Sequence, residues 1–171
     1  LANQYKDELL HNVLPFWLQN SQDKEFGGYF TCMDREGKVF DTDKFVWLQG
    51  REVWMFSMLY NKVEKRQEWL DCAVQGGEFL KKYGHNGEYN WYFSLDRLGR
   101  PLVEPYNIFS YTFATMAFGQ LSLATGNQEY ADIARKTFDI ILSKVDNPKG
   151  KWNKLHPDTR NLKNFALPMI L

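Results

Sequence analysis

The sequence has no excess charge of either sign, few cysteines and no long apolar run. Each of these absences argues against a class of protein. Its 21 basic and 21 acidic side chains cancel, whereas a sequence-independent nucleic-acid binder normally carries a basic surplus. Cys32 and Cys72 have neither metal-ligand spacing nor a disulfide framework, which is typical of a reduced, cytoplasmic protein. The absence of an apolar run of about 18 residues and the polar N-terminus LANQYKDELLHNVLPFW predict no membrane span and no signal peptide.

Aromatic side chains are what the sequence has in excess. They make up 16% of the 171 residues, as 6 Trp, 9 Tyr and 13 Phe. Such a content suits a large core, and it equally suits a pocket in which rings stack on a flat or sugar-like ligand. Composition leaves these two interpretations open.

Two kinds of helix alternate along the chain. Periodicity predicts amphipathic helices over 3–19, 66–83 and 127–144, helices apolar nearly all round over 43–62 and 107–124, and a last apolar segment beginning in LKNFALPMIL. Pro15 predicts a kink or an early end in the first of them. Because a helix that is apolar on all sides must be surrounded by protein, the alternation predicts two concentric layers. The expected fold is therefore an all-α toroid of helical hairpins.

An internal repeat supports the toroid. YFTCMDREGKV at Tyr29–Val39 recurs as YFSLDRLGRPL at Tyr92–Leu102, with the Asp-Arg-x-Gly portions 62 residues apart. Each copy predicts a β-hairpin with glycine in its turn, and we expect Asp34 and Asp96 to close these turns. Since each hairpin precedes an inner helix, the predicted unit is outer helix, hairpin, inner helix.

The segment KFVWLQGREVWMF places an arginine, Arg51, in the middle of a predicted helix with apolar side chains on nearly every side. At the repeat offset of 62, Phe113 stands where the first copy has Arg51, so the fold does not require the charge. This favours a ligand-binding role over a structural ion pair with a neighbour such as Glu52. The same offset aligns two further pairs, Trp47 with Phe109 and Gln49 with Tyr111.

The stretch FGGYFTCMDREGKVFDTDKFVWLQGREVWMFSMLYN, followed in order by GGEFL, IFSYTFATMAF and FALPMIL, resembles the N-acylglucosamine 2-epimerase family from end to end. The resemblance implies an (α/α)6 barrel, of which 1–171 would form a single domain of about three helical hairpins, with the ring continuing beyond it. It also implies a cytoplasmic isomerase of carbohydrate metabolism that epimerises C2 of N-acetylglucosamine and N-acetylmannosamine. The expected partners are a small amino sugar and, at full length, a second copy in a homodimer, with no nucleic acid or membrane.

The resemblance also implies residue roles. Arg51 matches the arginine of the family's QGR motif, which would hold the charge that develops on the enolate oxygen. The family's two catalytic histidines lie in its second half. His11, His85 and His156 do not resemble them, and we expect each to be a solvated histidine. The chain by itself is therefore expected to be inactive.

Further substrate-binding candidates surround the arginine. Trp47 and Trp54 share a helical stripe with Arg51 and would stack on a sugar ring, although plain core packing is the alternative for both. Tyr29 and Tyr111 are additional candidates for the pocket.

A basic loop near the C-terminus is a candidate nucleotide contact through Lys151 and Lys154. No cofactor is required by the resemblance, but ATP would act as an activator that is not consumed. The loop lacks the G-x-x-x-x-G-K-[ST] pattern, so a solvated basic loop is the competing interpretation. No metal site is predicted.

Two other function classes fit an α/α toroid. One is a non-catalytic module that binds a sugar or a protein. The other is a glycan-cleaving enzyme, which requires a pair of carboxylates across the scissile bond. The predicted inner helices offer no such pair.

Overall fold

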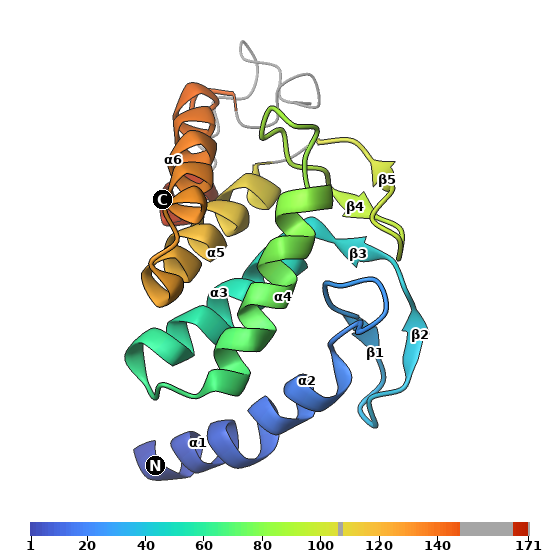
Figure 1. The fold of residues 1–171 in the computed structure, drawn as a ribbon, viewed down its shortest axis with the longest axis vertical. Coiled ribbons are helices and arrows are strands. Elements are labelled where there is room, and N and C mark those ends of the chain that lie inside the picture. The colour runs from blue at the N-terminus through green and yellow to red at the C-terminus, as the bar shows by residue number, and fades with distance from the viewer. Residues whose placement is uncertain (106–107, 148–165, 171) are drawn as a thin grey trace, which may run out of the picture.

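The computed structural model describes residues 1–105, 108–147 and 166–170. Its helices are α1 (Ala2–Glu8), a π-helical segment (Leu9–Val13), α2 (Leu14–Asn20), α3 (Val46–Lys62), α4 (Gln67–Tyr83), α5 (Phe109–Thr125), α6 (Gln128–Ser143) and α7 (Ala166–Ile170). Its strands are β1 (Cys32–Met33), β2 (Val39–Asp41), β3 (Lys44–Phe45), β4 (Ser94–Leu95) and β5 (Pro101–Val103). The strands gather to one side of the helices (Figure 1).

The helices form the two expected layers. The inner helices α3 and α5 pack extensively on each other, while α4 covers α3 and α6 covers α5 (Figure 1). Inner helices bury side chains on several faces; in α3 these include Val46, Val53 and Phe56. The amphipathic outer helices bury one face only, as Trp69 and Leu80 do in α4. This arrangement of helical hairpins belongs to a partial α/α toroid.

Both predicted β-hairpins form, and their turns have the same geometry. The peptide N–H of Gly37 donates to the Asp34 carbonyl, and that of Gly99 donates to the Asp96 carbonyl, each at 3.0 Å. Both glycines have positive φ, at 87° and 85°, which costs a glycine little. The Asp34 and Asp96 carboxylates also accept backbone N–H groups, each within its own turn. The prediction that these aspartates close the turns is confirmed.

The start of the first inner helix, α3, differs from the prediction. A helix was expected from residue 43, but Lys44 and Phe45 are extended and pair with Leu95 and Ser94 of the second hairpin. The strand order is therefore β3-β4-β5, so the segment that leads into α3 is part of the second hairpin's sheet. Pairing between distant segments overrides the local helical pattern here.

The first helix does not end at Pro15. The chain stays helical to Asn20, and the residues just before the proline, Leu9–Val13, form a π-helical segment. Proline has no N–H and its ring clashes with the carbonyl four residues earlier. A wider turn, in which the N–H of Leu14 donates to the Leu9 carbonyl, accommodates that change within a continuous helix.

The two glycines of GGEFL are explained by close packing. A Cβ added at Gly76 would lie 2.2 Å from the Tyr29 hydroxyl oxygen, and one at Gly77 would lie 2.4 Å from a methyl carbon of Leu121. Each glycine thus admits a bulky side chain from another element, at a cost of about 1 kcal/mol in helix propensity relative to alanine.

We expect Gly76→Ala to destabilise the protein by about 1–3 kcal/mol, because the methyl group has to displace the fully buried Tyr29 ring. Gly119→Ala on α5 is the matched control, since an added Cβ there meets nothing within 4 Å. The control should be neutral or slightly stabilising. Thermal unfolding of the two variants measures the difference, and equal midpoints would contradict the packing argument.

Candidate functional site

The inner helices border a cavity of about 470 Å³ whose walls are mostly aromatic. This volume falls within the range of small-molecule sites, about 300–1,000 Å³. Its described lining consists of Trp47, Arg51, Phe93, Phe109, Phe113 and Ile170. We call this cavity the aromatic pocket.

The repeat explains why these residues meet. Trp47 and Arg51 are four residues apart on α3, and Phe109 and Phe113 are four apart on α5, so each pair lies on one face of its helix. The two pairs are related by the repeat offset of 62. Equivalent positions of both inner helices therefore face the same cavity. This is expected of a toroid, in which the inner helices are arranged around a common axis.

Arg51 brings a positive charge into this apolar lining. Its side chain is exposed, and the guanidinium carbon lies 5.5 Å from the centre of the Phe113 ring, which is within cation–π range. Among the described residues, no carboxylate lies within ion-pair distance of Arg51. The Trp47 ring is 5.9 Å from the same phenylalanine ring, tilted by 47°. Arg51 is therefore available to a ligand.

The neighbours of Arg51 in the QGR motif place it there. The buried Gln49 side chain donates to the Tyr29 carbonyl and accepts from the Tyr29 N–H, both at 2.8 Å. A Cβ at Gly50 would lie 3.0 Å from the carbonyl carbon and oxygen of Phe113, so any larger residue would have to push the α5 backbone away by a few tenths of an ångström. Gln49 thus anchors one side of the helix while Gly50 brings Arg51 next to the Phe113 ring.

Glu52 points away from Arg51, as adjacent helical residues do. It is buried, and its carboxyl oxygen lies 2.5 Å from the hydroxyl of Ser21, the residue that follows α2. Burial raises the pKa of Glu52 to about 8, against the smaller opposing effect of the Ser21 hydrogen bond. The structural alternative for Arg51, an ion pair with Glu52, does not form.

The other predicted substrate contacts lie outside the described pocket lining. Tyr29 is fully buried, and its hydroxyl donates to the Cys72 carbonyl at 2.7 Å. Tyr111 is also buried, with its hydroxyl bonded to Asn90 and Lys144. Trp54 is half-buried and packs against the hydrophobic core. All three therefore have structural surroundings, and of the predicted aromatic contacts the structure brings Trp47 alone to Arg51.

The histidines of the described residues also lie apart from the pocket lining. His11 is exposed in the π-helical segment. His85 is not the solvated loop residue that we expected: it is half-buried, with its ring 4.8 Å from both Tyr89 and Trp91, and burial lowers its pKa. The predicted nucleotide contacts Lys151 and Lys154 lie outside the described residues, as does His156, which we expected to be solvated.

Four residues of the pocket are absent from the candidates chosen on the sequence, although two of them are aligned by the repeat: Phe93, Phe109, Phe113 and Ile170. The repeat offset could have found the two on α5, because it pairs them with Trp47 and Arg51. Phe93 and Ile170 come from the second hairpin and α7, whose approach to the pocket is not encoded locally.

Two further observations concern the described ranges, 1–105, 108–147 and 166–170. They hold no cluster of three or more His, Cys, Asp or Glu side chains arranged to bind a metal ion. None of their helices combines the length and apolar character needed to span a bilayer.

Chemically, the pocket combines flat apolar walls with one guanidinium. Aromatic faces bind the C–H faces of a ring-shaped ligand, and a guanidinium presents several N–H donors to an oxygen that carries negative charge. The described lining has no histidine or carboxylate. It can therefore bind and polarise a ligand, but it supplies no group for proton transfer near neutral pH.

The chain is similar to known sugar epimerases in both sequence and structure. The curated N-acylglucosamine 2-epimerases of Bos taurus and Homo sapiens are 41% and 44% identical to it over 167 residues, 95% of this chain. The chain spans 40% and 39% of their lengths. Two solved structures superpose on it: a sugar epimerase from a ruminal bacterium (TM-score 0.76, 27% identity, 83% of this chain and 36% of that one) and cellobiose 2-epimerase from Bacillus thermoamylovorans B4167 (TM-score 0.74, 28%, 82% and 36%).

The superposition confirms the expected fold, helical hairpins of an α/α toroid with short β-hairpins between them. The model of the family N-acylglucosamine 2-epimerase matches residues 28–167. That range includes both β-hairpins and all the described residues of the pocket lining except Ile170. The chain belongs to the N-acylglucosamine 2-epimerase family.

Proposed function

We propose that the protein containing this chain is a sugar 2-epimerase, and that the chain supplies the arginine side of its active site. The observation that carries the proposal is the Arg51 guanidinium, which lacks a carboxylate partner among the described residues and lies in a pocket with aromatic walls. Family membership supports the reaction class.

The reaction removes the proton on C2 of the open-chain sugar and returns a proton on the opposite face. That C–H is a weak acid because the charge left behind has to be carried by the C1 oxygen as an enolate. A preorganised donor aimed at this oxygen lowers the barrier where charge develops. Arg51 fills this role, since a guanidinium stays protonated at working pH and can donate hydrogen bonds to the enolate oxygen throughout the reaction. Trp47 and Phe113 hold the sugar chain beside it.

The groups that move the proton come from outside the described lining, which holds no histidine or carboxylate. The curated relatives are more than twice as long as this chain. We propose that the rest of the protein closes the ring and brings one base to each face of C2, with a pKa near the working pH.

The proposed substrate is an N-acylated amino sugar. This rests on identity: the curated N-acylglucosamine 2-epimerases are 40–44% identical to the chain, against 26–28% for the curated cellobiose 2-epimerases. Activation by ATP, assembly into a homodimer and location in the cytoplasm stay predictions from the resemblance.

The test is to incubate the longest natural form of the protein with N-acetylmannosamine in D2O and record proton NMR spectra. We expect N-acetylglucosamine to accumulate with deuterium at C2, because the abstracted proton exchanges with solvent. Cellobiose in a parallel reaction is the specificity control and should react more slowly.

If none of the sugars exchanges its C2 proton, the proposed function is wrong. Tight binding without exchange would favour a non-catalytic sugar-binding toroid. Faster turnover of cellobiose would overturn the substrate class and leave the epimerase reaction in place.

A further inference from the structure

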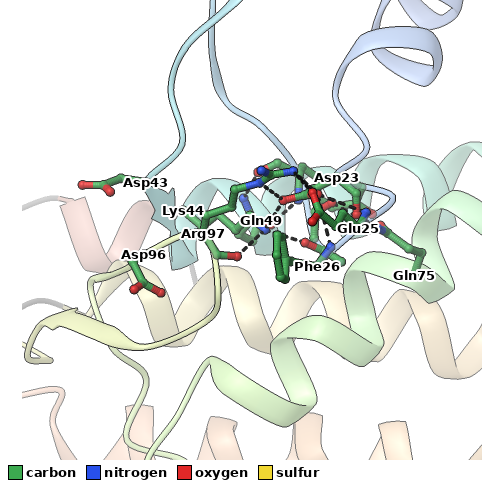
Figure 2. A network of polar contacts seen from close by, with 12 residues as sticks. Asp23, Glu25, Phe26, Asp43, Lys44, Gln49, Gln75, Asp96 and Arg97 are labelled. Carbon is green, nitrogen blue, oxygen red and sulfur yellow. Dashed lines mark hydrogen bonds and ion pairs between the residues drawn. The ribbon is translucent and has the colours of Figure 1, made fainter.

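A buried ion cluster lies at the side of the helices where the hairpins gather. The side chains of Asp23 and Lys44 are 1% and 0% exposed, and they form an ion pair of 3.0 Å. The Lys44 ammonium also donates to the Gly27 carbonyl at 2.6 Å and to the Arg97 carbonyl at 2.9 Å (Figure 2). Its three donors therefore have three acceptors, as a buried charge requires to offset desolvation.

Arg97 completes the cluster from the turn of the second hairpin. Its Nε and Nη2 donate to the two carboxylate oxygens of Asp23 at 2.9 and 3.1 Å, and Nη2 also donates to Glu25 at 3.0 Å (Figure 2). Burial raises the pKa of Asp23, but the hydrogen bonds from Arg97 and Lys44 outweigh it and hold the pKa at about 2. Because this contact is bidentate, it fixes the orientation of the Arg97 guanidinium relative to the Asp23 carboxylate as well as their separation.

The repeat shows that the hairpin itself does not need this contact. Arg35 occupies the same place in the first Asp-Arg-x-Gly turn, yet its side chain is 92% exposed and, among the residues that the structure describes, pairs only with the adjacent Glu36. Both turns are closed in the same way by their own aspartates. The cross-link made by Arg97 is thus an addition specific to the second copy.

The cluster joins the start of α3 to the second hairpin, and both of these segments contribute side chains to the aromatic pocket. Lys44 pairs through its backbone with Leu95. The ring of the next residue, Phe45, meets the Phe93 ring at 5.7 Å, and the N–H of Val46 donates to the Phe93 carbonyl at 3.0 Å. The base of the second hairpin, where Phe93 stands, is therefore fixed to the first residue of α3. Its turn is fixed to the same segment by the Lys44 side chain and Arg97.

We propose that Asp23, Lys44 and Arg97 form a clamp that sets the second hairpin against the start of α3, making Arg97 a positioning residue that holds Phe93 in place beside Trp47 and Arg51. This rests on the proposed function only for its effect on turnover. The effect on the position of Phe93 stands independently.

The test compares Arg97→Gln with Arg35→Gln in the longest natural form of the protein. Both substitutions remove a hairpin-turn arginine, but only the first breaks the clamp. Crystal structures of the two variants report the place of Phe93 relative to Arg51. Kinetics with the sugar that the wild type accepts report function. Arg97→Lys is the conservative variant and is used if Arg97→Gln folds poorly. It keeps one charged contact with Asp23 and should therefore retain more activity than Arg97→Gln.

We expect the second hairpin and Phe93 to shift in Arg97→Gln and to stay in place in Arg35→Gln. The kcat/KM of Arg97→Gln should fall by about tenfold or more, since a misplacement of about 1 Å can cost about 10²-fold. The activity of Arg35→Gln should match the wild type.

An unmoved Phe93 in Arg97→Gln would overturn the clamp whatever the activity. Equal kcat/KM for the two glutamine variants, measured well below their unfolding temperatures, would show that the cluster serves stability alone. A wild type without epimerase activity but with Phe93 displaced in Arg97→Gln would refute the proposed function and leave the clamp.

Discussion

We expect the replacement of Arg51 with alanine, in the longest natural form of the protein, to lower kcat by about 10²–10³-fold, the usual cost of removing one preorganised donor from a developing oxyanion. The loss should fall on kcat more than on KM, because the charge that Arg51 holds exists mainly in the transition state. Steady-state kinetics on N-acetylmannosamine measure both constants.

The same substitution should leave the fold intact. Arg51 is exposed, and its described contact is the cation–π interaction with Phe113, which is worth about 0.5–1 kcal/mol at an exposed site. Arg135→Ala on α6 is the matched control, because within the described part of the chain that arginine forms an ion pair only with Asp132, one turn away. A wild-type kcat in Arg51→Ala would refute the assigned role, whereas loss of activity in both variants would point to a general effect of removing a surface cation.

Replacing Glu52 with glutamine should stabilise the protein at neutral pH. The Ser21 hydroxyl oxygen lies 2.7 Å from the Trp17 carbonyl and 2.5 Å from the Glu52 carboxyl. A hydroxyl has one proton, and a carbonyl can only accept. While Glu52 is ionised, the single Ser21 proton is shared between the Glu52 carboxylate and the Trp17 carbonyl; once Glu52 is protonated, Ser21 can donate to Trp17 and the carboxyl can donate to Ser21. A glutamine side-chain amide can make the same donation without a titrating proton.

The direction of the pH effect follows from the raised pKa. Burial raises the pKa of Glu52 from an ordinary value of 4.5 to about 8. The unfolded chain therefore loses this proton at lower pH than the folded one, and the free energy of unfolding falls as pH rises from about 4.5 to about 8. At pH 7 this loss amounts to about 3 kcal/mol, which Glu52→Gln should recover.

Urea unfolding at pH 5 and pH 8 tests this expectation. Glu52→Gln should be nearly as stable as the wild type at pH 5 and clearly more stable at pH 8. Glu88→Gln, at an exposed carboxylate, is the control and should stay within about 0.5 kcal/mol at both values. The same pH dependence in the wild type and Glu52→Gln would mean that Glu52 is ionised in the folded state.

The sequence predicts the repeated part of the structure well, because the features that define it depend on residues close together in the chain. The Asp-Arg-x-Gly turns depend on an aspartate and a glycine a few residues apart, so Asp34 and Asp96 can be identified without knowing the fold. The apolar character of α3 and α5 likewise reports their burial directly. The repeat offset then relates Arg51 to Phe113, and the structure brings both to one pocket.

Long-range contacts account for what the sequence did not predict. Lys44 reads as a charged residue before an apolar helix, yet its burial depends on Asp23, 21 positions earlier, and on the carbonyl of Arg97, 53 positions later. Tyr29 was expected near the ligand, but its hydroxyl reaches the Cys72 carbonyl, 43 positions away. Neither partner can be inferred from neighbouring residues.

In the proposed reaction, Arg51 faces the C1 oxygen of an open-chain sugar held in the aromatic pocket. A crystal structure of the longest natural form of the protein with N-acetylmannosaminitol, the reduced open-chain analogue, tests it most directly. We expect a guanidinium nitrogen of Arg51 at about 2.7–3.2 Å from the C1 oxygen, with the carbon chain against Trp47 or Phe113. An analogue bound elsewhere, or one that turns its C1 oxygen away from Arg51, would contradict it.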